Sequence, residues 1–272
     1  MRYLPYATLK RAMLIFFLFT PFSQKLIAQT ASFRVLVVAS LAKDHVRMID
    51  SARPFFQKMA DENNFILDFT KDTSVINDSN LARYQVFVQL HLAPFDMSYA
   101  QQAALQKFID SGGGWVGIHA AGLTGRQFHP NSVYWEWFQE FMGGVVYSPH
   151  PKYQKATLIV EDSLHPATQG VARQFEIADE WYEFDKSPRP NVRVLARADE
   201  TTYQQNKPMG DHPMIWTNEK YRRAIYIGVG HDPSVLRNEN YVLLLRNAIL
   251  WAGSADKGKK ATHGRHRHRK KG

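Results

Sequence analysis

The sequence predicts an α/β fold: a mostly parallel sheet, covered by helices on both faces and extended by antiparallel edge strands. Two observations support a single domain of this fold. Short apolar runs rich in β-branched residues alternate with segments of helical periodicity through the first half, at the spacing of strand–helix–strand units. No linker rich in Pro, Gly and Ser divides the 272 residues. We therefore expect a single domain over residues 32–254, between two unusual ends, 1–28 and 255–272.

The elements of the first half follow one another in a regular order. Ser98 is a polar N-cap residue before apolar positions that share one helical face, and Gly112-Gly113 end that helix. The full set of expected elements is strands at 33–39, 65–69, 84–90 and 115–119, with helices at 46–61 and from Ser98 to Gly112.

Beyond Gly125 the pattern loosens. The expected elements there are an aromatic-rich helix at 133–142, strands at 156–160, 192–196, 214–217 and 223–228, a hairpin near Glu219, and a last helix at 240–251.

Residues 1–28 have the pattern of a secretory signal peptide. A basic start precedes the apolar run at 12–19, and Ala28 is a small residue at the expected cleavage point. The run is too short to span a bilayer, although an uncleaved anchor is the alternative. We therefore expect an exported protein, periplasmic or extracellular after cleavage, without a stable membrane anchor.

Residues 255–272 are predicted to be a disordered, basic, histidine-rich tail, because they contain almost nothing apolar. The formal net charge is +9, of which +7 comes from 255–272 and +4 from 1–29, so the residues between carry −2. A near-neutral body argues against a nucleic-acid-binding domain, which would carry its basic patch on the folded surface. The tail histidines fit either a solvated tail or a segment that binds metal or anionic surfaces.

The stretch Gly117-Ile118-His119-Ala120-Ala121 has the pattern of a nucleophile elbow. In such an elbow, small residues flank one reactive side chain at a sharp turn after a strand. Here the central residue is His119, whose imidazole transfers protons or binds metal but does not suit acyl-enzyme chemistry. The chain contains no cysteine, which excludes disulfides, cysteine metal ligands and a cysteine nucleophile.

Three further histidines, His45, His91 and His231, also follow expected strands. Because the carboxyl ends of parallel strands meet at one edge of a sheet, we expect these imidazoles and that of His119 at one rim. For each histidine alone, a hydrogen-bonded structural role is the alternative. Several together with a carboxylate would suit proton transfer or a divalent cation such as zinc.

The segment Asp179-Glu180-Trp181-Tyr182 is a second candidate. Its carboxylates offer a general acid or base, and its aromatic rings offer a stacking surface for a sugar. The alternative is a solvated acidic pair beside two core aromatics. His212 precedes Pro213, which holds it extended, either aimed into a cleft or within a turn.

The order of these motifs resembles the ThuA-like (trehalose utilisation) family of the class I glutamine amidotransferase-like superfamily. The elbow Gly-Gly-Gly-Trp-Val-Gly-Ile-His-Ala-Ala at 112–121 is followed by the acidic-aromatic segment 179–182, then His212-Pro213, then Gly228-Val229-Gly230-His231. The resemblance covers about residues 33–253 and implies a flavodoxin-like sheet.

The resemblance places His119 at the position of the amidotransferase nucleophilic cysteine and His231 at that of the catalytic histidine. Without cysteine, glutamine hydrolysis through a thioester is not available, so the chain is not expected to be a glutamine amidotransferase. The family's His-Asp pair after the first strand is only partly recognisable, as Asp44-His45.

The sequence leaves three functions open. The first is an exported enzyme of carbohydrate metabolism, a hydrolase, lyase or isomerase that acts on a sugar or oxidised sugar derivative. Its catalytic residues would be His119, His231 and Glu180, which would also hold any divalent metal. Its substrate-binding residues would be His45, Trp181, Tyr182 and His212.

The second is a non-catalytic carbohydrate-binding protein on the same scaffold, which would bind sugar without His119 and His231 but not without Trp181 or Tyr182. The third is a metal-scavenging protein that uses the tail. For the first two the expected partner is a small-molecule carbohydrate, without nucleic acid, and a homo-oligomer is compatible with the sequence.

Overall fold

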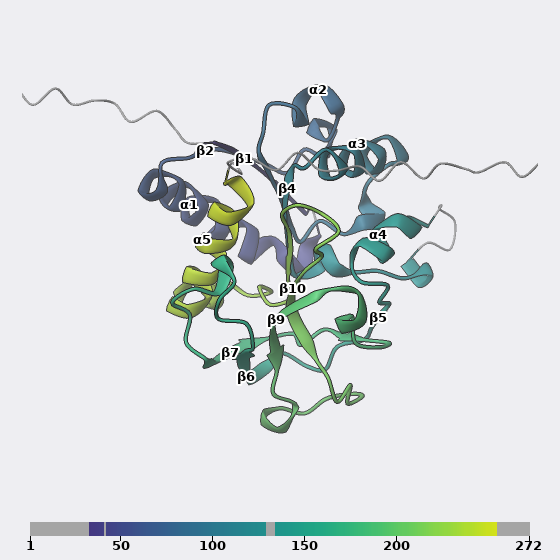
Figure 1. Ribbon diagram of the computed structural model, residues 1–272, viewed down its shortest axis with the longest axis vertical. Coiled ribbons are helices and arrows are strands. Elements are labelled where there is room, and N and C mark those ends of the chain that lie inside the picture. Colours follow the sequence, from purple (N-terminus) through teal and green to yellow (C-terminus); the bar gives the residue numbers. More distant parts are fainter. Residues whose placement is uncertain (1–32, 41, 129–133, 255–272) are drawn as a thin grey trace, which may run out of the picture. The chain divides into compact units, whose positions relative to one another are not determined.

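Figure 1 shows the central sheet with helices on both of its faces, in a computed structural model that describes residues 33–40, 42–128 and 134–254. Within these residues nine strands pair into one sheet. In order across the sheet they are β2 (Ile66–Thr70), β1 (Arg34–Ala39), β3 (Val86–Leu90), β4 (Gly114–Ile118), β11 (Ala224–Ile227), β10 (Pro213–Thr217), β9 (Arg193–Ala198), β6 (Gln154–Val160) and β7 (Gln174–Asp179). The short strands β5 (Tyr147–Ser148) and β8 (Glu183–Phe184) form a separate antiparallel pair.

The sheet has a parallel half and an antiparallel half. The neighbours from β2 through β1, β3 and β4 to β11 are all parallel. From β11 through β10, β9 and β6 to β7 every pairing is antiparallel. The order of the parallel half is flavodoxin-like. From β1 the chain adds β2 on one side and then β3 and β4 on the other, so the strand order reverses between β1 and β3. The predicted α/β fold, with its antiparallel extension and its hairpin between β10 and β11, is confirmed.

In the described part of the chain, five α-helices cover the two faces. They are α1 (Val46–Asn63), α2 (Asp78–Leu81), α3 (Tyr99–Asp110), α4 (Glu136–Phe141) and α5 (Glu239–Gly253). In Figure 1, α1 and α5 lie on one side of the parallel strands and α2, α3 and α4 on the other. The 3-10 turns between them are η1 (Lys43–His45), η2 (Thr73–Val75), η3 (Pro94–Asp96), η4 (His119–Gly122), η5 (Arg126–Phe128), η6 (Pro166–Thr168), η7 (Arg189–Asn191), η8 (Glu200–Thr202) and η9 (Pro233–Arg237).

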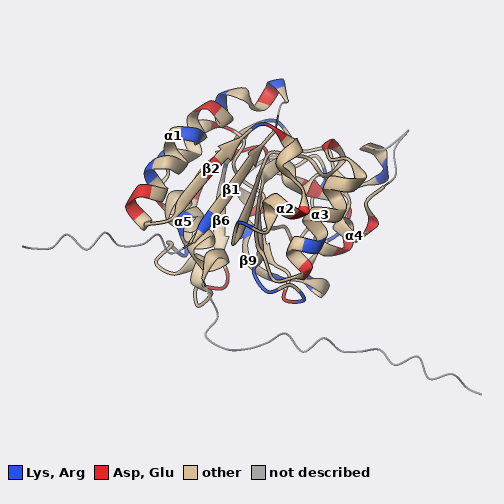
Figure 2. Cartoon of the chain, turned by 90° about the horizontal axis from the view of Figure 1, so that it is seen from above, with Lys and Arg blue, Asp and Glu red and all other residues tan. Residues whose placement is uncertain are grey.

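The core consists of two apolar layers, one on each face of the sheet. Side chains of β1 alternate between them: Val35 and Val37 pack in the layer beneath α1 and α5, while Leu36 and Val38 pack in the layer beneath α3. A strand buried on both faces is mostly apolar, which is why β1 is one continuous apolar run from Val35 to Ala39. Figure 2 shows the central strands almost free of charge, with charged side chains on the outer helices and loops.

Several expected elements change in detail. The helix expected at 133–142 is shorter, Glu136–Phe141, and position 133 lies outside the described residues. Strand β7 was not expected at all. Ser98 does cap α3, through a capping box with Gln101. The predicted signal peptide and tail lie outside the described residues, and within the described ranges no helix is long and apolar enough to cross a bilayer.

Candidate active site

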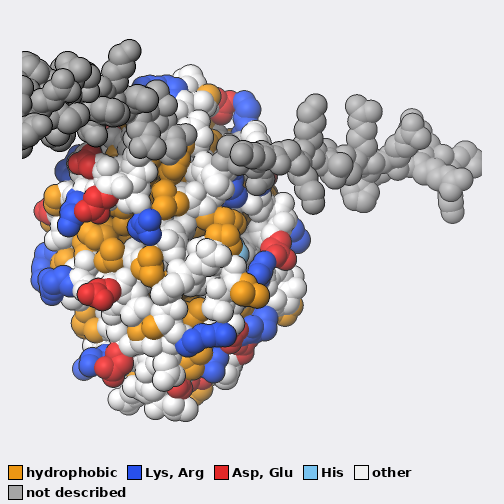
Figure 3. Space-filling view, turned by 60° about the vertical axis from the view of Figure 1, so that its left-hand side comes forward, with side chains coloured by type: hydrophobic (Ala, Val, Ile, Leu, Met, Phe, Trp, Pro, Cys, Tyr) orange, Lys and Arg blue, Asp and Glu red, His pale blue; other side chains and the backbone are white. Residues whose placement is uncertain are grey.

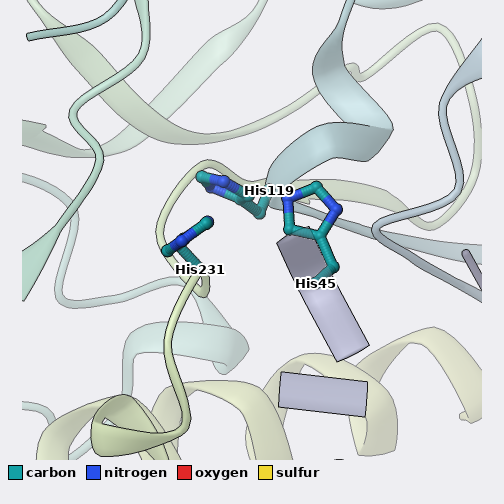
Figure 4. Close-up of side chains that lie close together, drawn as sticks. All are labelled: His45, His119 and His231. Atoms are coloured by element: carbon teal, nitrogen blue, oxygen red, sulfur yellow. The ribbon is translucent and has the colours of Figure 1, made fainter. Parts of the chain in front are cut away.

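The carboxyl ends of four parallel strands bring four histidines together. His45 follows β1, His91 follows β3, His119 follows β4, and His231 lies just beyond β11. The ring centroid of His119 lies 5.7 Å from that of His45, 5.1 Å from that of His91 and 5.2 Å from that of His231. Figure 4 shows the rings of His45, His119 and His231 gathered from three separate segments. The predicted convergence of these histidines at one rim is therefore observed.

His119 occupies a strained turn. Its backbone has φ 52°, in the left-handed region that costs most residues about 1–2 kcal/mol, and it begins the 3-10 turn η4 directly after β4. The end of η4 must also be small, because a Cβ added at Gly122 would lie 2.3 Å from the hydroxyl oxygen of Tyr226. His91, at the end of the neighbouring strand, is also left-handed, with φ 55°. Such strain concentrates at functional sites.

The His119 imidazole is fully buried and has one free nitrogen. Its Nδ1 lies 3.1 Å from the carbonyl oxygen of Gly228, and because a carbonyl only accepts, Nδ1 carries the ring proton. Its Nε2 has no hydrogen-bond partner among the described residues and lies 3.4 Å from Oε2 of Glu180. Burial lowers the pKa of His119 well below 6.5, so the ring is neutral. Nε2 of His119 therefore presents a lone pair towards the carboxylate of Glu180.

Glu180 contacts three histidines of the site. Its Oε2 lies 3.1 Å from Nδ1 of His231 and 3.4 Å from Nε2 of His150, in addition to the contact with His119. The side chains of Glu180, His231 and His150 are 19%, 20% and 28% exposed, so all three are reached from solvent. One carboxylate oxygen therefore stands among three imidazole nitrogens at the molecular surface.

Asp179 anchors this arrangement from beneath. It is fully buried, its Oδ2 accepts a 2.7 Å hydrogen bond from the backbone N–H of Gly230, and its Oδ1 accepts one of 2.9 Å from the N–H of Glu180. Burial raises the pKa of Asp179 to about 8, although these backbone donors oppose the shift. Three strands separate β7, which ends at Asp179, from β11 in the sheet. The Asp179–Gly230 bond therefore joins the end of the antiparallel half to the parallel rim.

His45 and His91 complete the cluster from the β1–β3 side. Their ring centroids are 4.4 Å apart, and the fully buried His91 donates through Nε2 to the carbonyl oxygen of Gly230 at 2.9 Å. Burial lowers the pKa of both rings. In the part of the chain that the structure describes, Nδ1 of each ring lacks a hydrogen-bond partner.

The cluster contains donors suited to a metal ion. Each of His45, His119 and His231 offers one ring nitrogen, and the three nitrogens lie within 4.8 Å of one another. Glu180 adds a carboxylate oxygen to two of them. Neutral imidazole and carboxylate are the donors that zinc and related divalent ions take.

Comparison with known proteins identifies the family. The ThuA family model, described as trehalose utilisation, matches residues 34–252. The chain belongs to the ThuA family. Its description connects the protein with carbohydrate metabolism.

Similar solved structures include two ThuA-like proteins. A ThuA-like protein from Bacteroides uniformis is 32% identical, with a TM-score of 0.76 over 85% of this chain and 95% of that one. A ThuA-like protein from Parabacteroides merdae is 17% identical, with a TM-score of 0.61 over 84% and 92%. A glutamine amidotransferase from Thermotoga maritima, 11% identical with a TM-score of 0.50 over 82% and 98%, shares the fold. No curated protein matches the chain.

Two residues expected to bind substrate in this ThuA domain lie elsewhere. Trp181 is fully buried, its indole Nε1 donates to the carbonyl oxygen of Gln154 at 2.9 Å, and its ring packs against Tyr203. His212 is 1% exposed and is held by Tyr203 and by the carbonyl oxygen of Tyr182. Both predictions are wrong, because rings enclosed by protein cannot stack on or bond to a sugar.

Tyr182 and His45 lie at the site but mostly beneath its surface. Tyr182 is 3% exposed, and its ring centroid is 4.2 Å from that of His119. It supports the imidazole from below. His45 is 7% exposed and takes its place in the histidine cluster.

His150 was missing from the expected site residues, and Asp179 was expected only as one carboxylate of an acidic pair. His150 lies in the loop after β5, and its place beside Glu180 depends on contacts distant in sequence. Asp179 stands next to Glu180 in an acidic pair, but only its burial shows that it acts as an anchor. The His-Pro sequence at 150–151 was the available signal for the first.

The surface away from the rim offers weaker alternatives. A hollow of about 240 Å³ between α2 and α3 is lined by Leu81, Ala104 and Phe108 together with neighbouring polar residues. On the face in Figure 3, cationic and anionic side chains are interspersed.

Proposed function

We propose that this ThuA-family protein is an enzyme that acts on a sugar or an oxidised sugar derivative, with His119, His231 and Glu180 as its reactive groups. The observation that carries the proposal is the position of Glu180 Oε2, within 3.4 Å of one nitrogen on each of three imidazoles. Hydrolysis, elimination and isomerisation of a sugar each require proton transfer, and such a set supplies both acceptors and donors.

The geometry divides the roles. His231, Glu180 and His150 are partly exposed, so they can touch a substrate that approaches the rim. His119 is enclosed and acts from behind, through the nitrogen that faces Glu180. Family membership supports a carbohydrate as the substrate class, since the family is described as trehalose utilisation.

The test is to incubate the purified protein with disaccharides, trehalose among them, and with their keto derivatives, and to follow the products by NMR. We expect E180Q and H231N to lose at least about 100-fold in turnover, the usual contribution of an acid–base group. The matched control is E176Q, on the exposed side of β7, where Glu176 pairs with Lys155 across the strands. Sugar binding without turnover in the wild-type protein would instead support a carbohydrate-binding protein.

The predicted signal peptide adds a second part to the proposal, that the enzyme works outside the cytoplasm. The mature protein should then begin close to residue 29. N-terminal sequencing of protein recovered from the native cells tests this, and a retained Met1 would refute it.

A further inference from the structure

We infer that the rim binds one divalent transition-metal ion, held by ring nitrogens of His45, His119 and His231 and by a carboxylate oxygen of Glu180. The inference concerns the same site as the proposed function. It does not require turnover, because binding is measured without substrate.

The separations of the donor atoms fit an ion. Metal–nitrogen and metal–oxygen bonds of about 2.0–2.1 Å in a tetrahedral site place neighbouring ligand atoms roughly 3.3 Å apart. Glu180 Oε2 lies 3.4 Å from Nε2 of His119 and 3.1 Å from Nδ1 of His231. His45 joins these ligands through the three histidine nitrogens, which lie within 4.8 Å of one another.

The charges at the rim call for a cation. Nδ1 of the buried, neutral His119 ring donates to the carbonyl oxygen of Gly228, so its Nε2 presents a lone pair. This lone pair lies 3.4 Å from Oε2 of Glu180. A lone pair and a carboxylate oxygen repel each other unless a positive charge stands between them. A divalent ion supplies that charge and takes both atoms as ligands.

The surroundings already hold the rings as metal sites do. A ligating histidine normally donates its other ring N–H to a carbonyl or carboxylate, which fixes the tautomer and the ring orientation. His119 does this through Gly228, and Asp179 fixes the backbone N–H groups of Gly230 and His231. Nε2 of the fully buried His119 has no hydrogen-bond partner within the described ranges. It is therefore the ring nitrogen whose lone pair most needs a metal ion.

The experiment must separate the rim from the tail, because His263, His266 and His268 offer a competing site. The full chain with these three replaced by Asn is stripped with a chelator and titrated with Zn²⁺ by calorimetry and with Co²⁺ by its visible d–d absorption. We expect one ion per chain. E180Q and H231N in this background should bind more than about 100-fold more weakly, since loss of an outer-shell partner alone costs 10–100-fold.

The control is H165N in the same background, since His165 is a buried histidine that packs on Trp251 and not on the rim. It should bind zinc like its parent. Circular dichroism and urea unfolding of the metal-free proteins check that E180Q and H231N, which change partly exposed side chains, remain folded.

Absence of zinc binding once the tail histidines are replaced would overturn the inference, as would unchanged affinity in E180Q or H231N. The two proposals fail separately. Zinc bound at the rim without turnover of any sugar would leave the metal site standing and refute the enzyme. Turnover of a sugar by metal-free protein that binds no zinc, if abolished in E180Q, would support the enzyme and refute the metal site.

Discussion

Asp179 holds the backbone that carries His231: its carboxylate accepts a 2.7 Å hydrogen bond from the N–H of Gly230 and 3.3 Å contacts from the N–H of His231. We expect stability to decrease from wild type to D179N to D179A, because Asn keeps one acceptor and Ala keeps none. Each buried donor left unpaired costs about 1–3 kcal/mol. Urea unfolding measures the series.

The control for this series is D232N, in the same loop. Asp232 accepts from the N–H of Ser234, and Asn can accept the same bond, so D232N should unfold close to wild type. D179A as stable as D232N would show that the anchor is dispensable.

The strained backbone at His119 leads to a second prediction. H119A and H119G both remove the imidazole, and they differ only in backbone freedom. At φ 52° glycine is favoured, so H119G should be more stable than H119A by about 1 kcal/mol. At His231, which is not among the residues with positive φ, the order should reverse, with H231A more stable than H231G. Thermal unfolding of the four variants compares them, and the same order at both positions would contradict the strain.

The parallel half was predictable from the sequence because its physics is local. Strands buried on both faces, such as β1 and β4, are mostly apolar, and they are separated by capped helices such as α3. Strand β7 was missed although Phe175 and Ile177 alternate with polar residues. The run is short, and only two of its three buried side chains are apolar.

The site was predictable only in part. His119 and His231 follow strands directly, so the parallel topology alone places them at one rim. The meeting of Glu180 with His119 and His231 depends instead on the end of β7 reaching the parallel rim, as the bond between Asp179 and Gly230 shows. A contact between residues 51 positions apart leaves no local pattern to read.

Neighbouring aromatics on opposite faces explain the error at Trp181. In extended chain, successive side chains point to opposite sides. Trp181 packs in the layer beneath α1 and α5, while Tyr182 packs in the other layer, against His119. The sequence shows two adjacent aromatics but not which of them faces the site.

The burial of Trp181 gives a third prediction. W181F leaves a void and the carbonyl oxygen of Gln154 without its indole donor, so we expect a loss of about 1–3 kcal/mol in unfolding free energy. Affinity for the sugar substrate should not change, because the indole does not reach the surface. Calorimetric binding and urea unfolding of W181F measure the two. Weakened sugar binding at wild-type stability would restore Trp181 as a stacking residue.

His165 gives a prediction about pH. It caps η6, with Nδ1 accepting from the N–H of Ala167, and burial lowers its pKa from 6.5 to about 4. Between pH 6.5 and about 4 the unfolded chain therefore binds a proton that the folded chain does not, so this residue makes stability fall on acidification through that window. Protonation would also turn the accepting nitrogen into a donor that faces the Ala167 N–H.

H165N should flatten this part of the profile. Asn accepts well at an N-cap and does not titrate, so near neutral pH the variant should keep most of the stability of wild type. Other buried histidines, His45, His91 and His119 among them, also have lowered pKa values and keep the remaining slope in both proteins. The measurement is urea unfolding of both proteins at several pH values from 7 to 4. Parallel profiles would show that His165 is already protonated in the folded state above pH 6, against its burial beside Trp251 and Arg193.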